Sequence, residues 1–152
     1  MLGRLRGYVT RRTGDVMHNE LVIKIEVPRG SFLKRELHDG SRVAFISPLP
    51  CPFNYGYILN SCGEDGDPED AIFFGRSCAV GEEVTGQAVG RVLFLDRDRR
   101  DNKTIVSDSP LSRTQKLALS TFFILYALGK RSLSIVTLQW GVKSRFEGIE
   151  SC

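Results

Sequence analysis

Glycines interrupt the chain at short intervals through its first two thirds, and this pattern limits the folds that it can adopt. They stand at positions 40, 56, 63, 66, 75, 81, 86 and 90. Between and around them lie segments typical of strands, at 21–27, 42–47, 71–74 and 84–95. Glycine in or beside a strand permits a bulge or a tight bend. The spacing therefore predicts a mainly β fold, with a small, strongly curved barrel in place of alternating βαβ units.

One long helix is expected after these segments. Ser109-Pro110 offers an N-cap followed by proline at the first helical position. A capping box follows one turn later, from Ser112 to Gln115. We expect the helix to end at Gly129, because glycine is common just beyond a helix C-terminus. Its later turns, F-F-I-L-Y-A-L, are apolar almost all round, so we expect another subunit to cover a second face.

Length and hydropathy favour one domain without a membrane span. The chain has 152 residues, of which 41% are hydrophobic and 26% charged, enough to bury a core. Its densest apolar run, 117–128, is far shorter than the ~20 residues that a span requires. We expect a last strand over 133–138 and a short helix or tail after Trp140. All of these belong to a single domain over 1–152 with no linker.

The net charge is only mildly positive, which is too weak a signal for nucleic-acid binding. Lys and Arg number 21, and Asp and Glu number 18, which gives +3. Basic residues precede the first acid, Asp15, at positions 4, 6, 11 and 12. We expect residues 1–20 to form a mobile terminus. A targeting segment is the alternative, since an Arg-rich, acid-poor start is typical of import signals.

The cysteine pattern indicates free thiols. The four cysteines are Cys51, Cys62, Cys78 and Cys152. None forms a C-x-x-C pair, and both histidines stand far from them in sequence, so no zinc site is indicated. Reduced thiols are the rule in the cytosol, and we therefore expect a cytoplasmic protein.

The acidic loop D-G-D-P-E-D, at 65–70, is the most informative stretch for function. It leads directly into A-I-F-F, so Asp70 stands at the mouth of a core strand, where a bare charge is costly. Pro68 stiffens the loop and favours an extended Asp67. Carboxylates this close repel one another, and hard divalent cations relieve that repulsion, so Mg²⁺ is the expected ligand. A solvated turn is the alternative interpretation.

Other charged residues become informative only in combination. Taken alone, the segment from Asp96 to Lys103 is a charged hairpin turn, and Glu26 is a surface charge. Lys34 and Glu36 alternate on one strand face and are likewise unremarkable by themselves.

Taken in order, these motifs resemble those of the soluble family I inorganic pyrophosphatases. They are I-E-V-P at 25–28, K-R-E at 34–36, Arg42, N-Y-G-Y-I at 54–58, D-G-D-P-E-D at 65–70, and Asp96, Asp101 and Lys103. The match runs from about 21 to 106, with a weaker continuation to Trp140. A D-x-D motif alone is unspecific, whereas the ordered set at these spacings is a strong signal.

The resemblance implies a five-stranded closed barrel of OB type with flanking helices, in an α+β chain that forms a homohexamer in bacteria. It implies Mg²⁺-dependent hydrolysis of inorganic pyrophosphate to two orthophosphates by in-line attack of water. The first metal ion would be held by Asp65, Asp70 and Asp101, a second by Asp70, a third by Asp96 and Asp101, and a fourth, through water, by Glu26, with Glu36 supporting the metal shell. The general base would be Asp67, and phosphate oxygens would be bound by Lys34, Arg42, Lys103, Tyr55 and Tyr126.

Departures from the family pattern leave an alternative open. The family has a phosphate-binding Tyr where this chain has Cys51, and a Lys where Ala127 follows Tyr126. Lys130, nearly one turn further on, is a candidate substitute. The alternative is a catalytically weak paralogue that binds phosphate or polyphosphate compounds. An OB-type nucleic-acid binder is a further alternative, but its groove would have to be basic, and the carboxylates predict an acidic one.

Overall fold

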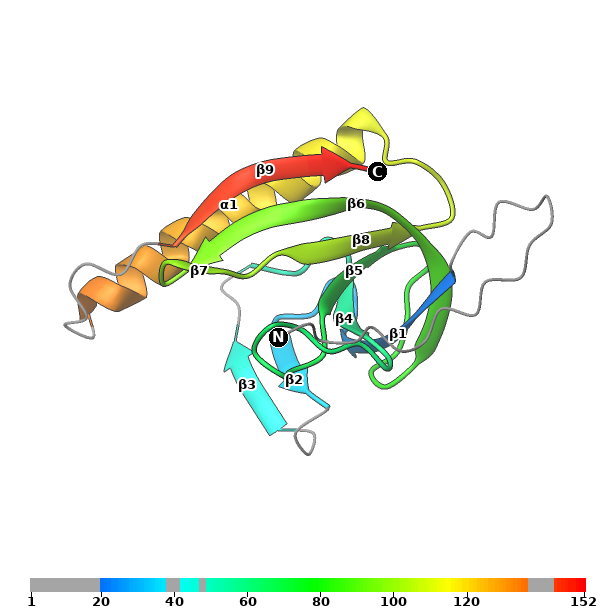
Figure 1. The fold of residues 1–152 in the computed structure, drawn as a ribbon. Helices are drawn as coiled ribbons and strands as arrows, with labels where there is room; N and C mark the ends of the chain where they lie inside the picture. The colour runs from blue at the N-terminus through cyan, green and yellow to red at the C-terminus, as the bar shows by residue number, and fades with distance from the viewer. Residues whose placement is uncertain (1–19, 38–41, 47–48, 137–143) are drawn as a thin grey trace, which may run out of the picture.

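A closed ring of five strands forms the centre of the molecule (Figure 1). The computed structural model describes residues 20–37, 42–46, 49–136 and 144–152, without the side chains of 34–36, 42–46 and 133–136. Around the ring, the order is β1 (Glu20–Val27), β4 (Asn54–Ile58), β5 (Asp70–Phe74), β8 (Lys103–Ser107) and β6 (Glu83–Asp96), which pairs with β1 again. Neighbours are antiparallel except β5 and β8, which are parallel. The prediction of a five-stranded OB-like barrel is confirmed.

The long strand β6 closes the ring because it bends and changes partners along its length. Its first residues pair with β1, and its later residues pair with β8 on one side and β9 (Arg145–Ser151) on the other. A register shift between Ala88 and Gly90 marks the bend. At Gly90 a Cβ atom would stand 2.4 Å from the Glu150 carbonyl oxygen, so only glycine permits this close approach.

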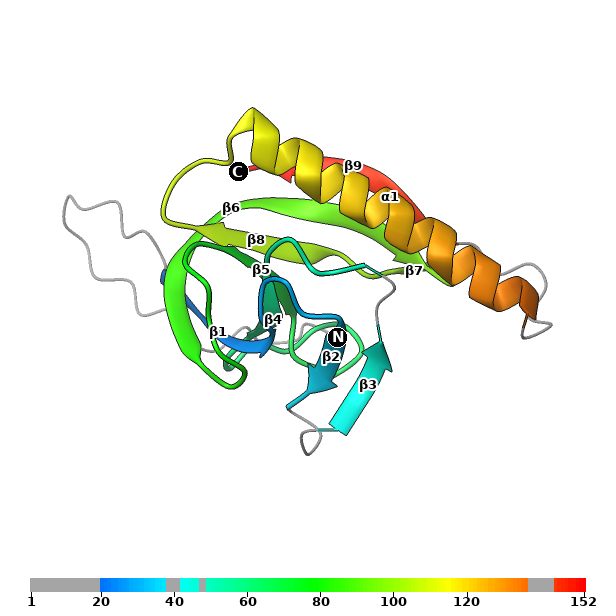
Figure 2. The same ribbon diagram turned by 180° about the vertical axis from the view of Figure 1, so that it is seen from behind.

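The helix α1 (Arg113–Val136) packs along β9 and β6, as the view from behind shows (Figure 2). Its buried stripe is formed by Leu119, Phe123 and Ala127, at a spacing of four residues. Phe123 stacks on Phe53 and on Phe146, with ring centroids 6.0 and 6.3 Å apart. These contacts fix the helix against the barrel and the C-terminal strand together.

The start of the helix is predicted correctly at its capping box but not at its proline. The Ser112 N–H donates to Gln115 Oε1 at 2.8 Å, and the Gln115 N–H donates to Ser112 Oγ at 3.1 Å. The helix therefore begins at Arg113, and Pro110 lies in the segment before it.

The predicted end of the helix at Gly129 is wrong, since α1 continues to Val136. Gly129 does not adopt the positive φ of a C-terminal cap, and glycine inside a helix costs only about 1 kcal/mol. Tertiary contacts outweigh that cost: Lys130 pairs with Asp96, and the Arg131 Nε–H donates to the Ser144 carbonyl oxygen at 2.8 Å.

The predictions for the last twenty residues, 133–152, are wrong where the structure describes them. Residues 133–136 are helical and not part of a strand, while 137–143, including Trp140, lie outside the described residues. In place of a helix or tail, residues 145–151 form β9. A register shift beside Gly148, whose φ is 142°, breaks the alternation, so that Phe146 and Ile149 both pack against the core.

The remaining elements are short. A separate two-stranded sheet consists of β2 (Leu33–Glu36) and β3 (Arg42–Ile46), and β7 (Arg99–Arg100) extends the main sheet beside β6. The mobile terminus is predicted over 1–20; residues 1–19 lie outside the described part, and Glu20 is the first residue of β1. Among the helices that the structure describes, none has the length and apolar character that crossing a membrane requires.

The closest backbone approach in the barrel gives a test of the strand pairing. At Gly56 an added Cβ would stand 1.9 Å from the Lys24 carbonyl oxygen, whereas Gly81, with φ of 81°, has open space around it. Gly56→Ala should therefore lower the free energy of unfolding by about 3 kcal/mol because β1 and β4 must separate. Gly81→Ala should lower it by about 1 kcal/mol, through backbone strain alone. Urea denaturation measures both, and an equal loss would contradict the assigned register.

Candidate active site

A cavity of about 200 Å³ lies between one end of the barrel and α1. One part of its wall is charged or phenolic, and the other part is apolar and largely aromatic. The first part comprises Tyr55, Asp70, Asp96, Asp101, Lys103, Tyr126 and Lys130, and the second includes Val27, Phe32, Cys51, Phe53, Phe122 and Phe123. Six of the residues that the resemblance named for metal or substrate thus line a single cavity.

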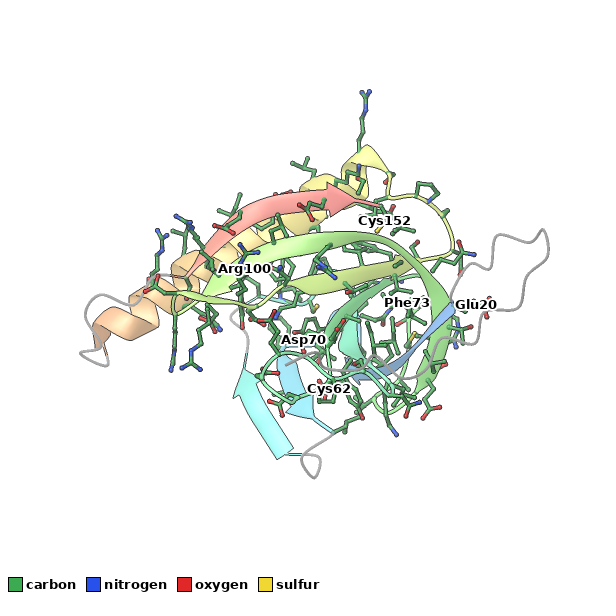
Figure 3. The ribbon with its side chains drawn as sticks, viewed as in Figure 1. Glu20, Cys62, Asp70, Phe73, Arg100 and Cys152 are labelled. Atoms are coloured by element: carbon green, nitrogen blue, oxygen red, sulfur yellow. The ribbon has the colours of Figure 1, made fainter. Side chains whose placement is uncertain are left out.

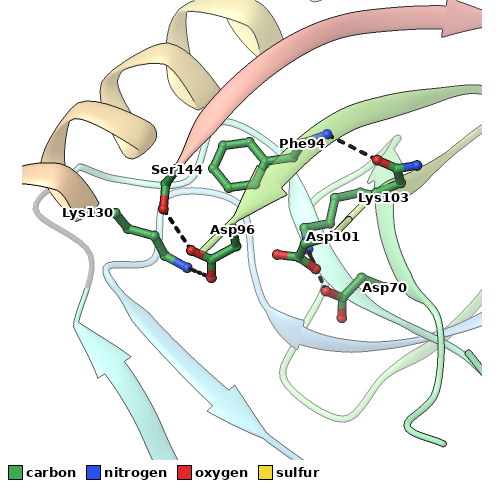
Figure 4. Close-up of polar contacts among 8 residues, drawn as sticks. Asp70, Phe94, Asp96, Asp101, Lys103, Lys130 and Ser144 are labelled. Carbon is green, nitrogen blue, oxygen red and sulfur yellow. Dashed lines mark hydrogen bonds and ion pairs between the residues drawn. The ribbon is translucent and has the colours of Figure 1, made fainter. Parts of the chain in front are cut away.

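Lys103 links two of the carboxylates (Figure 4). Its side chain is only 5% exposed, and its Nζ lies 2.7 Å from Asp70 Oδ2 and is also paired with Asp101 Oδ1. Burial alone would lower the pKa of Lys103, but the two carboxylates outweigh it, and the pKa is raised. Lys103 therefore stays charged and holds Asp70 and Asp101 on either side of one cation.

The parallel pairing of β5 and β8 places these residues together. Ala71 pairs with Thr104, so the residues just before them, Asp70 and Lys103, begin neighbouring strands at the same edge. Asp101 is brought to the same edge because its N–H donates to the Phe94 carbonyl oxygen at 2.9 Å, which joins its segment to β6. Figure 3 marks Asp70 where the acidic loop enters β5.

Asp96 is the last residue of β6, and each of its carboxylate oxygens contacts another side chain. Arg97 and Asp98, with φ of 51° and 61°, form the tight turn that leads into β7. Asp96 Oδ2 is paired with Lys130 Nζ, and Oδ1 accepts a hydrogen bond from Ser144 Oγ at 2.8 Å. Burial would raise the pKa of Asp96, but Lys130 and Ser144 outweigh it, so the pKa is lowered and the carboxylate stays ionised.

The two tyrosines lie beside the two lysines. Lys103 Nζ is 5.9 Å from the Tyr55 ring centroid, and Lys130 Nζ is 5.0 Å from that of Tyr126. Burial, and next the charges of Asp70 and Asp101, raise the pKa of Tyr55 well above its ordinary value. Its phenol therefore remains a neutral hydrogen-bond donor at physiological pH.

Asp65 and Asp67 do not line the cavity. Both are exposed in the loop before β5, where the Asp67 N–H donates to Asp65 Oδ1 at 3.1 Å. The Gly63 N–H donates to the Asp67 carbonyl oxygen at 2.7 Å, which closes the turn. The structure thus brings the last carboxylate of the loop into the cavity and leaves the first two at the surface.

Glu26 is buried, with 2% of its surface exposed, and its Oε1 accepts a hydrogen bond from the Leu37 N–H at 2.7 Å. It therefore joins β1 to the segment just after β2. The backbone of Lys34, Glu36 and Arg42 lies in β2 and β3, and their side chains lie outside the described part.

The cavity carboxylates fit a hard cation in their chemistry, although they are spread apart. Within the described residues, no cluster of three or more His, Cys, Asp or Glu side chains has the arrangement of a metal site. Asp70 and Asp101 nevertheless flank one cationic group, the Lys103 ammonium, and carboxylate oxygens are the ligands that Mg²⁺ prefers. The donor set is therefore suited to Mg²⁺, which would share these oxygens with lysine.

Sequence reasoning did not include Ser144 in the site and gave Lys130 only as a candidate substitute. Lys130 follows Tyr126 by four residues, which places both on one helix face, but this spacing matters only if the helix passes Gly129. Ser144 carries no local signal, because it reaches Asp96 across 48 positions of sequence.

The fold and the cavity together define an OB-like barrel protein in which carboxylates, tyrosines and lysines line one cavity. The family model described as inorganic pyrophosphatase matches residues 23–123, about two thirds of the sequence, and the chain belongs to this family.

Individual relatives agree with this assignment. The inorganic pyrophosphatase of Corynebacterium glutamicum is 28% identical over 146 residues, which cover 85% of this chain and 92% of that protein. That of Aquifex pyrophilus is 30% identical over 105 residues, 65% of this chain. The match spans less than two thirds of some relatives, 59% for A. pyrophilus and 57% for Saccharolobus solfataricus.

Solved structures show the same fold. An inorganic pyrophosphatase from Helicobacter pylori superposes with a TM-score of 0.71 at 23% identity, covering 92% of this chain and 90% of that one. One from Thermus thermophilus gives a TM-score of 0.70 at 22% identity, covering 93% and 88%.

The cysteines offer a test of the cavity wall. Cys51 and Cys78 are buried, and Cys62 and Cys152 are exposed. Burial raises the pKa of the Cys51 thiol to about 12 and also raises that of Cys78, so few thiolates form at pH 8. A disulfide-exchange reagent such as DTNB should label two of the four thiols rapidly and the other two only after unfolding. Rapid labelling of Cys51, identified by mass spectrometry, would contradict the burial of this thiol in the cavity wall.

Proposed function

We propose that this chain hydrolyses inorganic pyrophosphate to two orthophosphates with Mg²⁺. One observation carries the proposal: in a member of the inorganic pyrophosphatase family, Asp70, Asp101 and Lys103 meet in one cavity that Tyr55 also lines. Pyrophosphate carries several negative charges, so its reaction with water needs cationic groups at the phosphates. The cavity supplies lysine cations and the oxygen donors that attract metal cations.

The metal ligands in this proposal come from several segments. They are Asp70, Asp101 and Asp96 at the cavity, Asp65 from the exposed loop, and Glu26 and Glu36 as supporting carboxylates. Bound Mg²⁺ would supply two things, screening of the phosphate charge and a lowered pKa of a bound water. Asp70 is central among the ligands, because it stands between the loop and the barrel edge.

The protein's own groups bind the substrate and accept the proton of the attacking water. We assign phosphate contacts to Lys34, Arg42, Tyr55, Lys103 and Tyr126. A protonated Tyr55 donates to a phosphate oxygen, and Lys103 stabilises the charge that develops on the departing phosphate. Asp67, exposed on the loop, accepts the proton of the attacking water as general base.

A second candidate is a catalytically weak paralogue that binds phosphate or polyphosphate compounds without useful turnover. Cys51 supports it, because this thiol is buried and protonated where the family has a phosphate-binding tyrosine. Ala127 supports it too, because it packs in the core where the family has a lysine.

The proposal extends to the organisation of the protein. We infer a single pyrophosphatase domain over 1–152 that assembles as a homohexamer, since Leu117, Ile124, Leu125 and Leu128 leave an apolar face of α1 exposed. A cytoplasmic location is consistent with four free cysteines.

The direct test is release of orthophosphate from pyrophosphate. Release should require Mg²⁺ and stop with excess EDTA, because without divalent cations the substrate and the cavity carboxylates repel one another. Colorimetric phosphate assay with the full chain measures it. Absence of metal-stimulated release at micromolar protein would favour the weak paralogue.

Two carboxylate variants separate the base from the metal ligands. Asp67→Asn should lower kcat by ~10²–10⁴-fold and leave metal affinity near wild type, because Asp67 accepts a proton. Asp70→Asn should lower both kcat and metal affinity, because Asp70 is assigned to two ions. Isothermal titration with Mg²⁺ and steady-state kinetics provide the readouts.

The matched controls are Glu69→Gln and Asp98→Asn, two exposed carboxylates outside the cavity, which should stay within about twofold of wild type. Unchanged activity in Asp70→Asn would contradict the metal assignment.

A further inference from the structure

We propose that the ammonium group of Lys130 is a built-in cation of this site: it occupies at Asp96 the place that a divalent ion would take, and it binds a phosphate group of the substrate. The inference deepens the proposed function and rests on it for the identity of the substrate, and it replaces the assignment of Asp96 as a metal ligand by a contact of Asp96 with Lys130. It assigns Lys130 as a substrate-binding residue and Asp96 as the residue that positions it.

The first argument is the occupation of Asp96. Lys130 Nζ pairs with Oδ2, and Ser144 Oγ donates to Oδ1 at 2.8 Å, so the chain's own donors contact both oxygens. A metal ion binding here would have to displace a charge-assisted hydrogen bond between Lys130 and Asp96. Asp70 and Asp101 differ from Asp96 in this respect, because a single ammonium, that of Lys103, pairs with both of them.

The second argument is that Lys130 is held from several sides. It stands in the turn of α1 after Gly129, four residues beyond Tyr126, and its Nζ lies 5.0 Å from the Tyr126 ring centroid. The next residue, Arg131, donates to the Ser144 carbonyl oxygen at 2.8 Å, which fixes the serine that contacts Asp96. Helix, strand end and residue 144 thus meet at one carboxylate, as Figure 4 shows.

The third argument is access. The Lys130 side chain is 26% exposed and lines the cavity, whereas that of Lys103 is 5% exposed and lies between two carboxylates. An ammonium has three N–H donors, so a contact with Asp96 is compatible with a further contact to a phosphate oxygen. Of Lys103 and Lys130, Lys130 is therefore the one that an entering anion can reach.

The experiment compares three lysine variants of the full chain. Lys130→Met removes the charge and keeps the length, and Lys130→Arg keeps the charge. Lys116→Met is the matched control on the same helix, because its Nζ contacts Ser151 Oγ away from the cavity. Circular dichroism melts establish that each variant is folded.

The first readout needs no activity. Mn²⁺ bound per chain, counted by electron paramagnetic resonance without substrate, should rise by one ion in Lys130→Met, because Asp96 becomes available. It should stay at the wild-type value in Lys130→Arg and in Lys116→Met. An unchanged count in Lys130→Met would overturn the proposal that Lys130 replaces a divalent ion.

The second readout is binding of imidodiphosphate, a non-hydrolysable pyrophosphate analogue, by isothermal titration at subsaturating Mg²⁺. Lys130→Met should bind it about 10–100-fold more weakly than wild type, and the gap should narrow as Mg²⁺ rises and fills the vacated place. Lys130→Arg should retain most of the affinity. Equal affinity of Lys130→Met and wild type at low Mg²⁺ would overturn the assignment to substrate binding.

These readouts are independent of turnover. A wild-type protein that binds imidodiphosphate but releases no phosphate from pyrophosphate would refute the proposed hydrolysis, and the comparison of variants would still decide the role of Lys130. A merely structural role would lower the melting temperature of Lys130→Met while leaving its ion count and its analogue affinity unchanged.

Discussion

The ion pairs of Lys103 with Asp70 and Asp101 are the interaction on which the cavity depends. An ammonium with 5% exposure is stable only where opposite charges surround it. Burial of Lys103 therefore requires that Asp70 and Asp101 lie beside it. The parallel register of β5 and β8 meets this requirement, because Asp70 and Lys103 begin adjacent strands. Closure of the ring through β6 then brings Asp101 to the same edge.

The second lysine of the cavity is held in a different way, and the difference separates their roles. Lys103 belongs to the barrel and is paired with Asp70 and Asp101, whereas Lys130 belongs to the helix and is paired with Asp96. The aromatic contacts of Phe123 fix the helix against the barrel and thereby fix this second cation. The two halves of the cavity wall are therefore coupled: the apolar half determines where one charge of the polar half stands.

Much of the barrel and part of the site could be predicted from sequence, because the relevant signals are local. Alternating strands, glycines at close approaches and the capping box from Ser112 to Gln115 each act within a few residues. The ordered motifs also predicted that Asp70, Asp101 and Lys103 belong to one site. The helix end and β9 could not be predicted in the same way. Contacts of Arg131 and Lys130 with distant residues override the glycine, and the bulge at Gly148 hides the strand periodicity.

The two-residue turn after Asp96 has an evolutionary consequence. Because Arg97 and Asp98 alone reverse the chain, the turn sets how many positions separate Asp96 from Asp101. An insertion there would extend a surface hairpin, and the ring of strands could still close. The same insertion would change the spacing of two carboxylates that line the same cavity. Descendants of this chain can therefore vary in length at many loops and keep both architecture and chemistry. At this turn, however, an insertion that is compatible with folding would be selected against for its effect on activity.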